Sequence, residues 1–230
     1  MKFVLLAILI FSLNLFAQTY TFSGGKNNVV QMVASKVLQK AYAEADIEIE
    51  ALFLPLQESL EQSNEGITDG ELARIEKITE LYPNLRRIPV SISSVEAVAF
   101  SKRKDIFIRD WNDLQGRDFT VVRGAKFIES ATRKMKKQYV NSIQEAFVNL
   151  ENNKTDIIVL PKKSAIRLIL KKEFKNIKPI SGTLEKLELF HFVHKKNAYL
   201  IPIITPILQE MKDNGEILYM NNAFLREVTH

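Results

Sequence analysis

Cysteine is absent from this chain of 230 residues. The absence excludes disulfide bonds, thiolate nucleophiles and thiolate metal ligands, so ordinary packing must stabilise the fold. Histidine is also scarce, with 3 residues, and His191 and His194 lie three apart on an expected strand. Side chains three apart on a strand point to opposite faces, so these two cannot share a metal ion. The sequence therefore predicts neither a metal nor any other cofactor.

Long hydrophobic runs are absent beyond the N-terminus. Residues 3–16 form one apolar run after Lys2, and Ala17 precedes the polar Gln18. The run has about 14 residues, fewer than the roughly 20 that a spanning helix needs. A charged start, a short apolar segment and a small residue are typical of a signal peptide. We expect residues 1–17 to be removed on export to the periplasm; the alternative is an N-terminal membrane anchor.

A strong excess of one charge is also missing. The chain has 32 basic and 27 acidic residues, a formal net charge of +5. Basic clusters such as residues 133–137 are interrupted and scattered through expected helices. A solvated surface explains this distribution better than a nucleic-acid patch. We expect a monomer without a nucleic-acid partner.

Hydrophobic patterning predicts alternating strands and helices, which is an α/β fold. Expected strands cover residues 19–23, 47–53, 87–102, 118–123, 156–160 and 187–193, with a short strand and turn at 66–70. Expected helices cover residues 27–44, 71–82, 126–138, 143–152 and 198–213, with two that start at Pro55 and Pro161 and a single turn at 111–116. The continuous apolar run at 156–160 is typical of a parallel strand covered on both faces.

The order of these elements predicts two lobes. Two βα units of similar size are joined by two extended segments, as when a chain enters a second lobe and then returns. We expect residues 18–99 and 190–230 to form one lobe and residues 104–186 the other, with a hinge near 100–104 and 187–194. A cleft between lobes is a common place for a small ligand.

Several motifs occur in an informative order. They are NEGITDGELARI, YPNL, VEAVAFSK, WNDLQG, VVRG, NNKTDIIV, FVHKKN and MKDNGEI. Together they resemble the extracellular solute-binding proteins of family 3, which serve polar amino-acid uptake systems. The resemblance implies a two-lobed periplasmic-binding-protein-like (type 2) fold that closes on a small ligand and has no catalytic activity. The expected partner is a membrane permease or a sensor.

The resemblance also implies ligand-binding residues. Asp69 and Gly70 would form a turn that lines the cleft, and Arg74 would grip a ligand carboxylate through its two-pronged guanidinium. The alternative is that Arg74 lies on the outer face of a helix. The first strand ends near Phe22 and Ser23, where the aromatic ring would stack on a ligand or lie in the core.

A second candidate is the turn VVRGAK, in which Arg123, Gly124 and Lys126 lie between a strand and a helix. Free backbone N–H groups at such a turn can hold an anion, with Arg123 and Lys126 adding positive charge. The alternative is that Arg123 and Lys126 are surface residues. Two departures from the family pattern reduce the expected contacts: Ala125 replaces a hydroxyl residue, and Leu160 replaces an acidic residue that would accept the ligand's ammonium group.

Three functions are consistent with these features. The first is a periplasmic protein that encloses a small polar, carboxylate-bearing solute such as an amino acid, for an ABC uptake system. The second is a binding fold retained for sensing or protein interaction without tight ligand affinity, which the changes at Ala125 and Leu160 favour. The third is a hydrolase, but no nucleophile, base and orienting partner can be assembled from these residues.

Overall fold

The computed structural model describes residues 19–170, 174 and 176–229, and it describes side chains as far as residue 223. The predicted signal peptide at residues 1–17 lies outside the described residues. Within them, no helix is both long and apolar enough to cross a membrane.

The strands form one mixed sheet in the order β2-β1-β3-β9-β4-β7-β5-β6, with β8 paired to β4. The strands are β1 (Tyr20–Gly25), β2 (Ile49–Leu54), β3 (Gly70–Arg74), β4 (Leu85–Ser101), β5 (Phe119–Val122), β6 (Gln138–Val140), β7 (Ile157–Pro161), β8 (Lys178–Pro179) and β9 (Glu185–His194). The α-helices are α1 (Val29–Ala43), α2 (Leu56–Glu65), α3 (Lys126–Ala131), α4 (Ile143–Glu151), α5 (Lys162–Leu170), α6 (Ile201–Asp213) and α7 (Glu216–Thr229). The 3-10 turns are η1 (Glu76–Glu80), η2 (Trp111–Leu114) and η3 (Lys195–Leu200). The predicted α/β class is confirmed.

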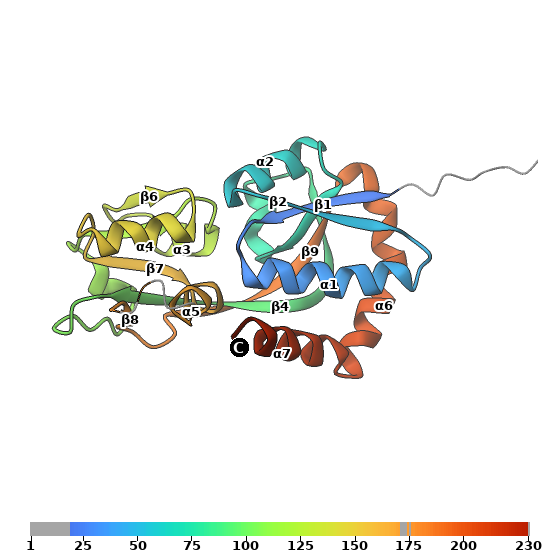
Figure 1. The fold of residues 1–230 in the computed structure, drawn as a ribbon. Coiled ribbons are helices and arrows are strands. Elements are labelled where there is room, and N and C mark those ends of the chain that lie inside the picture. The colour runs from blue at the N-terminus through green and yellow to red at the C-terminus, as the bar shows by residue number, and fades with distance from the viewer. Residues whose placement is uncertain (1–18, 171–173, 175, 230) are drawn as a thin grey trace, which may run out of the picture.

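Two lobes lie side by side along this sheet (Figure 1). We call the part that contains β1–β3, α1, α2, α6 and α7 lobe 1, and the part that contains β5–β8 and α3–α5 lobe 2. The antiparallel strands β4 and β9 connect them as a two-stranded ribbon. β4 pairs with β9 as far as Ala97 and with β7 from Ala97 onward, so it changes partner a few residues before the predicted hinge at 100–104.

Lobe 1 follows from a parallel βα pattern. β1 pairs with β2 on one side and β3 on the other. The Asn28 side chain caps α1 by accepting hydrogen bonds from the backbone N–H groups of Val30 and Gln31, which satisfies donors that a helix start leaves free. The apolar face of α1 then packs on the sheet, with Val33 and Val37 among its buried residues.

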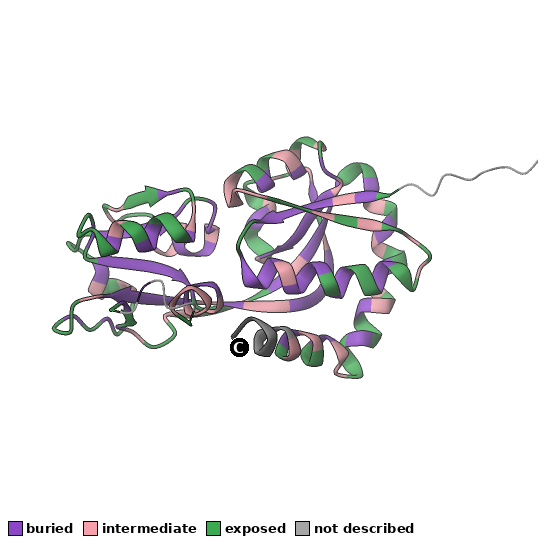
Figure 2. Cartoon of the chain, viewed as in Figure 1, coloured by how far each residue is buried: buried purple, intermediate pink, exposed green. Residues whose placement is uncertain are grey.

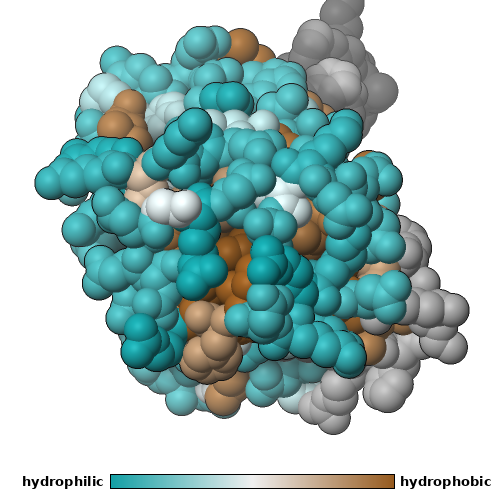
Figure 3. All heavy atoms as spheres, turned by 90° about the vertical axis from the view of Figure 1, so that its left-hand side faces the viewer, coloured by the Kyte–Doolittle hydropathy of each residue, from teal (hydrophilic) through white to brown (hydrophobic). Residues whose placement is uncertain are grey.

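Lobe 2 repeats the same logic on a smaller scale. All five residues of β7 are buried, as the predicted continuous apolar run requires, and β5 pairs with it in parallel. Ser142 caps α4 by accepting a hydrogen bond from the backbone N–H of Glu145, as predicted. Figure 2 shows the central strands of both lobes as buried, and Figure 3 shows a mainly hydrophilic face at the end where lobe 2 lies.

The helix predicted at residues 71–82 is wrong. Residues 70–74 form the central strand β3, with every residue buried, and the 3-10 turn η1 follows. The short strand predicted at 66–70 is wrong as well, since Gly66 ends α2 in a left-handed conformation and Gly70 opens β3. β3 pairs with β1 on one side and with β9 on the other. This pairing outweighs the helical spacing of Leu72, Ile75 and Ile78.

Two further differences concern helices. The helix predicted at 126–138 ends at Ala131, because residues 138–140 pair with β5 as strand β6. The sequence prediction did not include α7, which packs beside α1 and α6.

Candidate functional site

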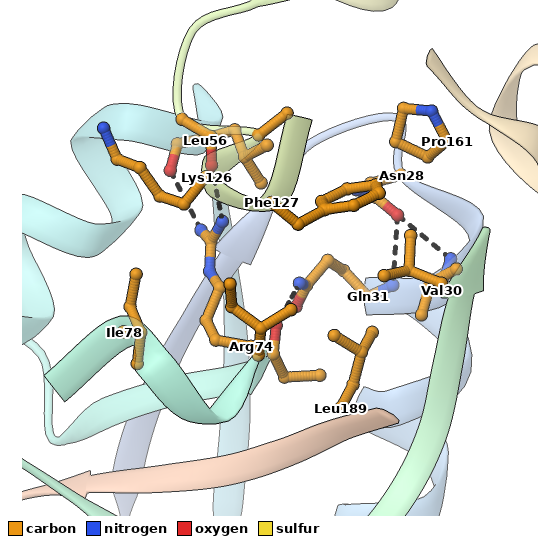
Figure 4. Close-up of a pocket in the computed structure, with 15 residues that line it drawn as sticks. Asn28, Val30, Gln31, Leu56, Arg74, Ile78, Lys126, Phe127, Pro161 and Leu189 are labelled. Atoms are coloured by element: carbon orange, nitrogen blue, oxygen red, sulfur yellow. Dashed lines mark hydrogen bonds between the residues drawn. The ribbon is translucent and has the colours of Figure 1, made fainter. Parts of the chain in front are cut away.

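A small pocket lies between the lobes, where β3 ends and α3 begins (Figure 4). Lobe 1 contributes residues of α1 and β3, lobe 2 contributes the start of α3 and Pro161, and the connecting ribbon contributes Val95 and Leu189. The lining is mainly apolar, with Asn28, Gln31, Arg74 and Lys126 as its polar side chains. The cavity is about 40 Å³, far below the volume of typical ligand pockets.

Arg74 lies at this pocket, at the C-terminal end of β3. Its side chain is paired with Glu71, which is on the same strand: Nε lies 2.8 Å and Nη2 2.7 Å from Glu71 Oε1. Arg74 Nη2 also donates to the backbone carbonyl of Leu56 at 2.9 Å, and Nη1 to that of Gly124 at 3.3 Å (Figure 4). The guanidinium therefore joins both lobes while most of its donors are used within the protein.

Glu71 is fully buried beneath the pocket. Ser59 Oγ donates to its Oε2 at 2.6 Å, and the hydroxyls of Ser23 and Ser63 lie 3.4 Å from the same oxygen. Burial raises the pKa of the Glu71 carboxyl, and the Arg74 guanidinium and the Ser59 hydroxyl oppose this rise. A guanidinium is permanently charged, so the two groups form a buried ion pair.

Phe22 and Ser23 do not line the pocket. Phe22 is fully buried in the core, where its ring centroid lies 5.3 Å from that of Tyr42 and 4.6 Å from that of His191. Of the two predicted environments, stacking on a ligand or packing in the core, the structure places this ring in the core. Ser23 Oγ donates to the backbone carbonyl of Ser59 at 3.0 Å and belongs to the shell around Glu71.

Asp69 and Gly70 lie at the opposite end of β3 from the pocket. The Asp69 carboxylate accepts hydrogen bonds from the backbone N–H of Thr21 at 2.9 Å and from Asn197 Nδ2 at 2.9 Å, and it pairs with Lys196 at 3.1 Å. Desolvation raises the pKa of this carboxyl, but these contacts outweigh it and the net shift is downward. The predicted turn at Asp69 and Gly70 is therefore not at the cleft.

The turn at residues 123–126 does face lobe 1. Gly124 has a φ of +87°, and a Cβ at this position would lie 2.6 Å from the backbone nitrogen of Gln57. Only glycine permits this close approach of the two lobes. Arg123 lies outside the pocket, exposed, with its guanidinium 4.9 Å from the centroid of the Tyr139 ring.

The same turn already holds a carboxylate of the protein. Glu129 Oε1 accepts a hydrogen bond from the Gly124 backbone N–H at 2.7 Å, and Glu129 Oε2 pairs with Lys126 Nζ at 2.8 Å. The predicted anion site at this turn is thus occupied by Glu129. Ala125 and Leu160, the two departures from the family pattern, are both buried.

The sequence prediction missed Gln31. The residue is 3% exposed, and Nε2 donates to the Ala73 carbonyl at 2.5 Å, while Oε1 has no hydrogen-bond partner within the part of the chain that the structure describes. The available signal is a polar residue in helical register with Ala34, Ser35 and Leu38, near the point where the first strand ends. Only the fold shows that this register faces the pocket.

Across the described residues, no three His, Asp or Glu side chains are grouped so that they could hold a metal ion. His191 instead lies in the core of lobe 1, with one ring nitrogen 2.9 Å from the Glu71 carbonyl and the other 2.9 Å from the Tyr42 hydroxyl.

Comparisons with known proteins agree with this architecture. No protein-family model and no curated protein sequence matches the chain. Solved structures do match. One is an ancestral arginine-binding protein bound to arginine: the sequence identity is 15%, the alignment covers 90% of this chain and 97% of that chain, and the TM-score is 0.74. A histidine kinase sensor domain with similarity to periplasmic binding proteins has 15% identity, 90% and 96% coverage and a TM-score of 0.77.

The substrate-binding protein of an amino acid ABC transporter is similar as well, with 16% identity, 91% of this chain and 100% of that chain covered and a TM-score of 0.73. Identities this low establish similarity of fold alone. The chain therefore has the type 2 periplasmic-binding-protein fold, as the sequence predicts.

Proposed function

We propose that this chain is a non-catalytic binding protein that encloses a small solute between its two lobes. The observation that carries the proposal is a pocket lined by both lobes and by the ribbon that joins them. Direct contacts surround it: Arg74 donates to the Gly124 carbonyl at 3.3 Å, and the Val29 backbone N–H donates to Ser164 Oγ at 3.1 Å. These contacts exist only when the lobes are together, so they couple closure to the pocket.

We propose lobe boundaries at residues 18–99 plus 190–230 and 104–186, with the hinge near 100–104 and 187–194. The change of partner by β4 at Ala97 supports a boundary in this region. Export to the periplasm with removal of residues 1–17, a monomeric state, and delivery to a membrane permease or a sensor complete the proposal. The fold similarity to the substrate-binding protein of an amino acid ABC transporter and to a histidine kinase sensor domain supports both kinds of partner.

The proposed closure can be measured directly because the chain has no cysteine. Glu65 on α2 and Glu151 on α4 are exposed and lie on different lobes, so a Glu65→Cys, Glu151→Cys variant accepts one label on each lobe. A thermal-shift screen of amino acids, dicarboxylates, amides and short peptides should identify a solute. A ligand at 100 times its Kd should add about 2.7 kcal/mol to the free energy of unfolding.

The expected result is that the identified solute narrows the distribution of distances between the labels. A control variant with both labels on lobe 1, at Lys36 and Glu65, should show no change. A solute that stabilises the protein without changing the distance between lobes would contradict enclosure. The carboxylate-bearing class that the sequence predicts enters the same screen as one group among several.

A second function is favoured by a different observation. The cavity of about 40 Å³ is small, and Arg74 already bridges the lobes through its contacts with Leu56 and Gly124. A closed arrangement held by the protein itself suits a fold that senses or binds a protein partner without tight ligand affinity. Closed label distances before any solute is added, unchanged across the whole screen, would support this function over solute binding.

A further inference from the structure

We propose that the interlobe pocket selects an uncharged solute, and that this solute donates a hydrogen bond to Gln31 Oε1. The inference rests on the proposed solute-binding function and names the chemical class of the solute. Gln31 then determines specificity. The sequence predicts instead that Arg74 grips a ligand carboxylate.

The orientation of the Gln31 amide is determined by its neighbour. Nε2 lies 2.5 Å from the Ala73 carbonyl, an acceptor, so the amide nitrogen must face β3 and the oxygen must face the other way. No donor among the described residues reaches Oε1, which is itself buried and lies beside Gly24, in a residue that lines the pocket. A buried acceptor without a donor is unfavourable, so a ligand N–H or O–H at this oxygen contributes to binding.

The charges around the pocket are already balanced. Arg74 is paired with Glu71 at 2.7 Å, and Lys126 with Glu129 at 2.8 Å. A ligand carboxylate would therefore have to compete with a carboxylate of the protein at either cation. An ammonium group would find no free acid, since both carboxylates are engaged and Leu160 stands where the family pattern has an acidic residue.

The rest of the pocket specifies an apolar body. Val30, Leu56, Ile75, Phe127, Pro161 and Leu189 supply most of its walls. Burial of a charged group against such walls is unfavourable without a free partner, whereas burial of alkyl groups is favourable. A small molecule with an alkyl part and one amide or hydroxyl donor fits these walls and Gln31 Oε1 together.

Three probes with the same isopropyl group test this class on the wild-type protein: isobutyramide, isobutyrate, which has the same shape as the amide, and isobutylammonium. We expect isobutyramide to bind at least tenfold more tightly than either charged probe in calorimetry at neutral pH. Zwitterionic amino acids of similar size should also bind more weakly. Tighter binding of isobutyrate, isobutylammonium or an amino acid would overturn the inference and leave the proposed function intact.

Two variants test the role of Gln31. Gln31→Leu should reduce isobutyramide affinity at least tenfold, and Gln31→Glu should shift the preference to isobutylammonium. The matched control is Gln57→Leu: Gln57 Oε1 also has no partner among the described residues, but its Nε2 points to Glu61 and Tyr82, away from the pocket. It should bind isobutyramide as the wild type does.

The outcomes separate the two proposals. Equal affinities of wild type and Gln31→Leu for isobutyramide would contradict the role of Gln31. Should Gln31→Leu fail to fold, as judged by circular dichroism, the wild-type probe series decides the chemical class without it. If no probe and no solute of any class binds or closes the lobes, the proposed function itself is wrong, and this inference with it.

Discussion

Each lobe brings one cation to the pocket and pairs it with a carboxylate of the same lobe, but the two pairs are buried to different extents. In lobe 1 the Arg74 and Glu71 side chains are 7% and 0% exposed. In lobe 2 the corresponding values for Lys126 and Glu129 are 17% and 16%. Hydroxyl groups surround the first pair, whereas the second lies at a turn close to solvent. Lobe 1 therefore offers a fixed surface, and lobe 2 offers an adaptable one.

The most sensitive test of this difference is Glu71→Gln, which removes the charge and keeps the shape. Arg74 would then be buried without its counter-ion, and breaking a buried pair typically costs about 3–5 kcal/mol. We expect a loss of this size in the free energy of unfolding, measured by urea denaturation at pH 7. A loss below about 1 kcal/mol would show that water or other groups reach Arg74 and that lobe 1 is not the fixed half.

Acidification tests the interior of lobe 1 at His191. Burial lowers the pKa of this imidazole to about 4, below its ordinary value of about 6.5. The unfolded chain therefore binds more protons than the native protein between these values. The contribution of His191 to the free energy of unfolding is fully present above pH 6.5. It decreases by about 3 kcal/mol in total as the pH falls toward 4.

Comparison with His191→Gln isolates this effect. The raised pKa of Glu71 gives a pH dependence of the opposite sign, which both proteins share. We expect the variant to lose less stability than the wild type between pH 7 and pH 4.5 in parallel urea titrations. Identical pH profiles would show that His191 is not the group that resists protonation.

Gly124→Ala tests the closest approach between the lobes. A side chain at a φ of +87° is strained by about 1–2 kcal/mol, and its Cβ would lie 2.6 Å from the Gln57 nitrogen. We expect the variant to separate the lobes, seen as a longer distance between labels on Glu65→Cys and Glu151→Cys. The control is Gly116→Ala, where φ is +77° and no atom lies within 4 Å of the added Cβ. Gly116→Ala should lose free energy of unfolding through the same backbone strain, and the distance between the two labels should not change.

The smallest expected effect is that of Glu129→Gln in lobe 2. The amide can still accept the hydrogen bond from the Gly124 backbone N–H, and only the partly exposed pairing with Lys126 is lost. Pairs of this kind typically contribute about 0.2–1 kcal/mol. Urea denaturation should therefore show a far smaller loss than for Glu71→Gln, and equal losses would remove the contrast between the lobes.

Much of the fold could be predicted because local chemistry determines it. Ser142 caps α4, and the apolar run of β7 is buried, as its composition indicates. The segment 70–82 could not be predicted, since Leu72, Ile75 and Ile78 have helical spacing and only pairing with β1 and β9 makes residues 70–74 a strand.

The same limit applies to the site. The sequence places Arg74 and the turn at residues 123–126 near a cleft, and both do reach the pocket. It does not reveal that Glu71 and Glu129 engage them, because each pairing depends on three-dimensional distances. Gln31 was missed for a similar reason, since only the packing of α1 against β3 shows where its oxygen points.

The ribbon of β4 and β9 limits how the lobes can move. Its two strands are paired from Leu85 with His194 to Ala97 with Glu185, with register shifts between Arg87 and Ser93. Sliding one strand along the other by a residue would exchange inward and outward side chains, so the ribbon is stiff to shear. Twisting and bending preserve the pairing and are the soft modes. The proposed opening of the pocket is therefore a rotation of one lobe about the ribbon, in which residues farther from β4 move farther.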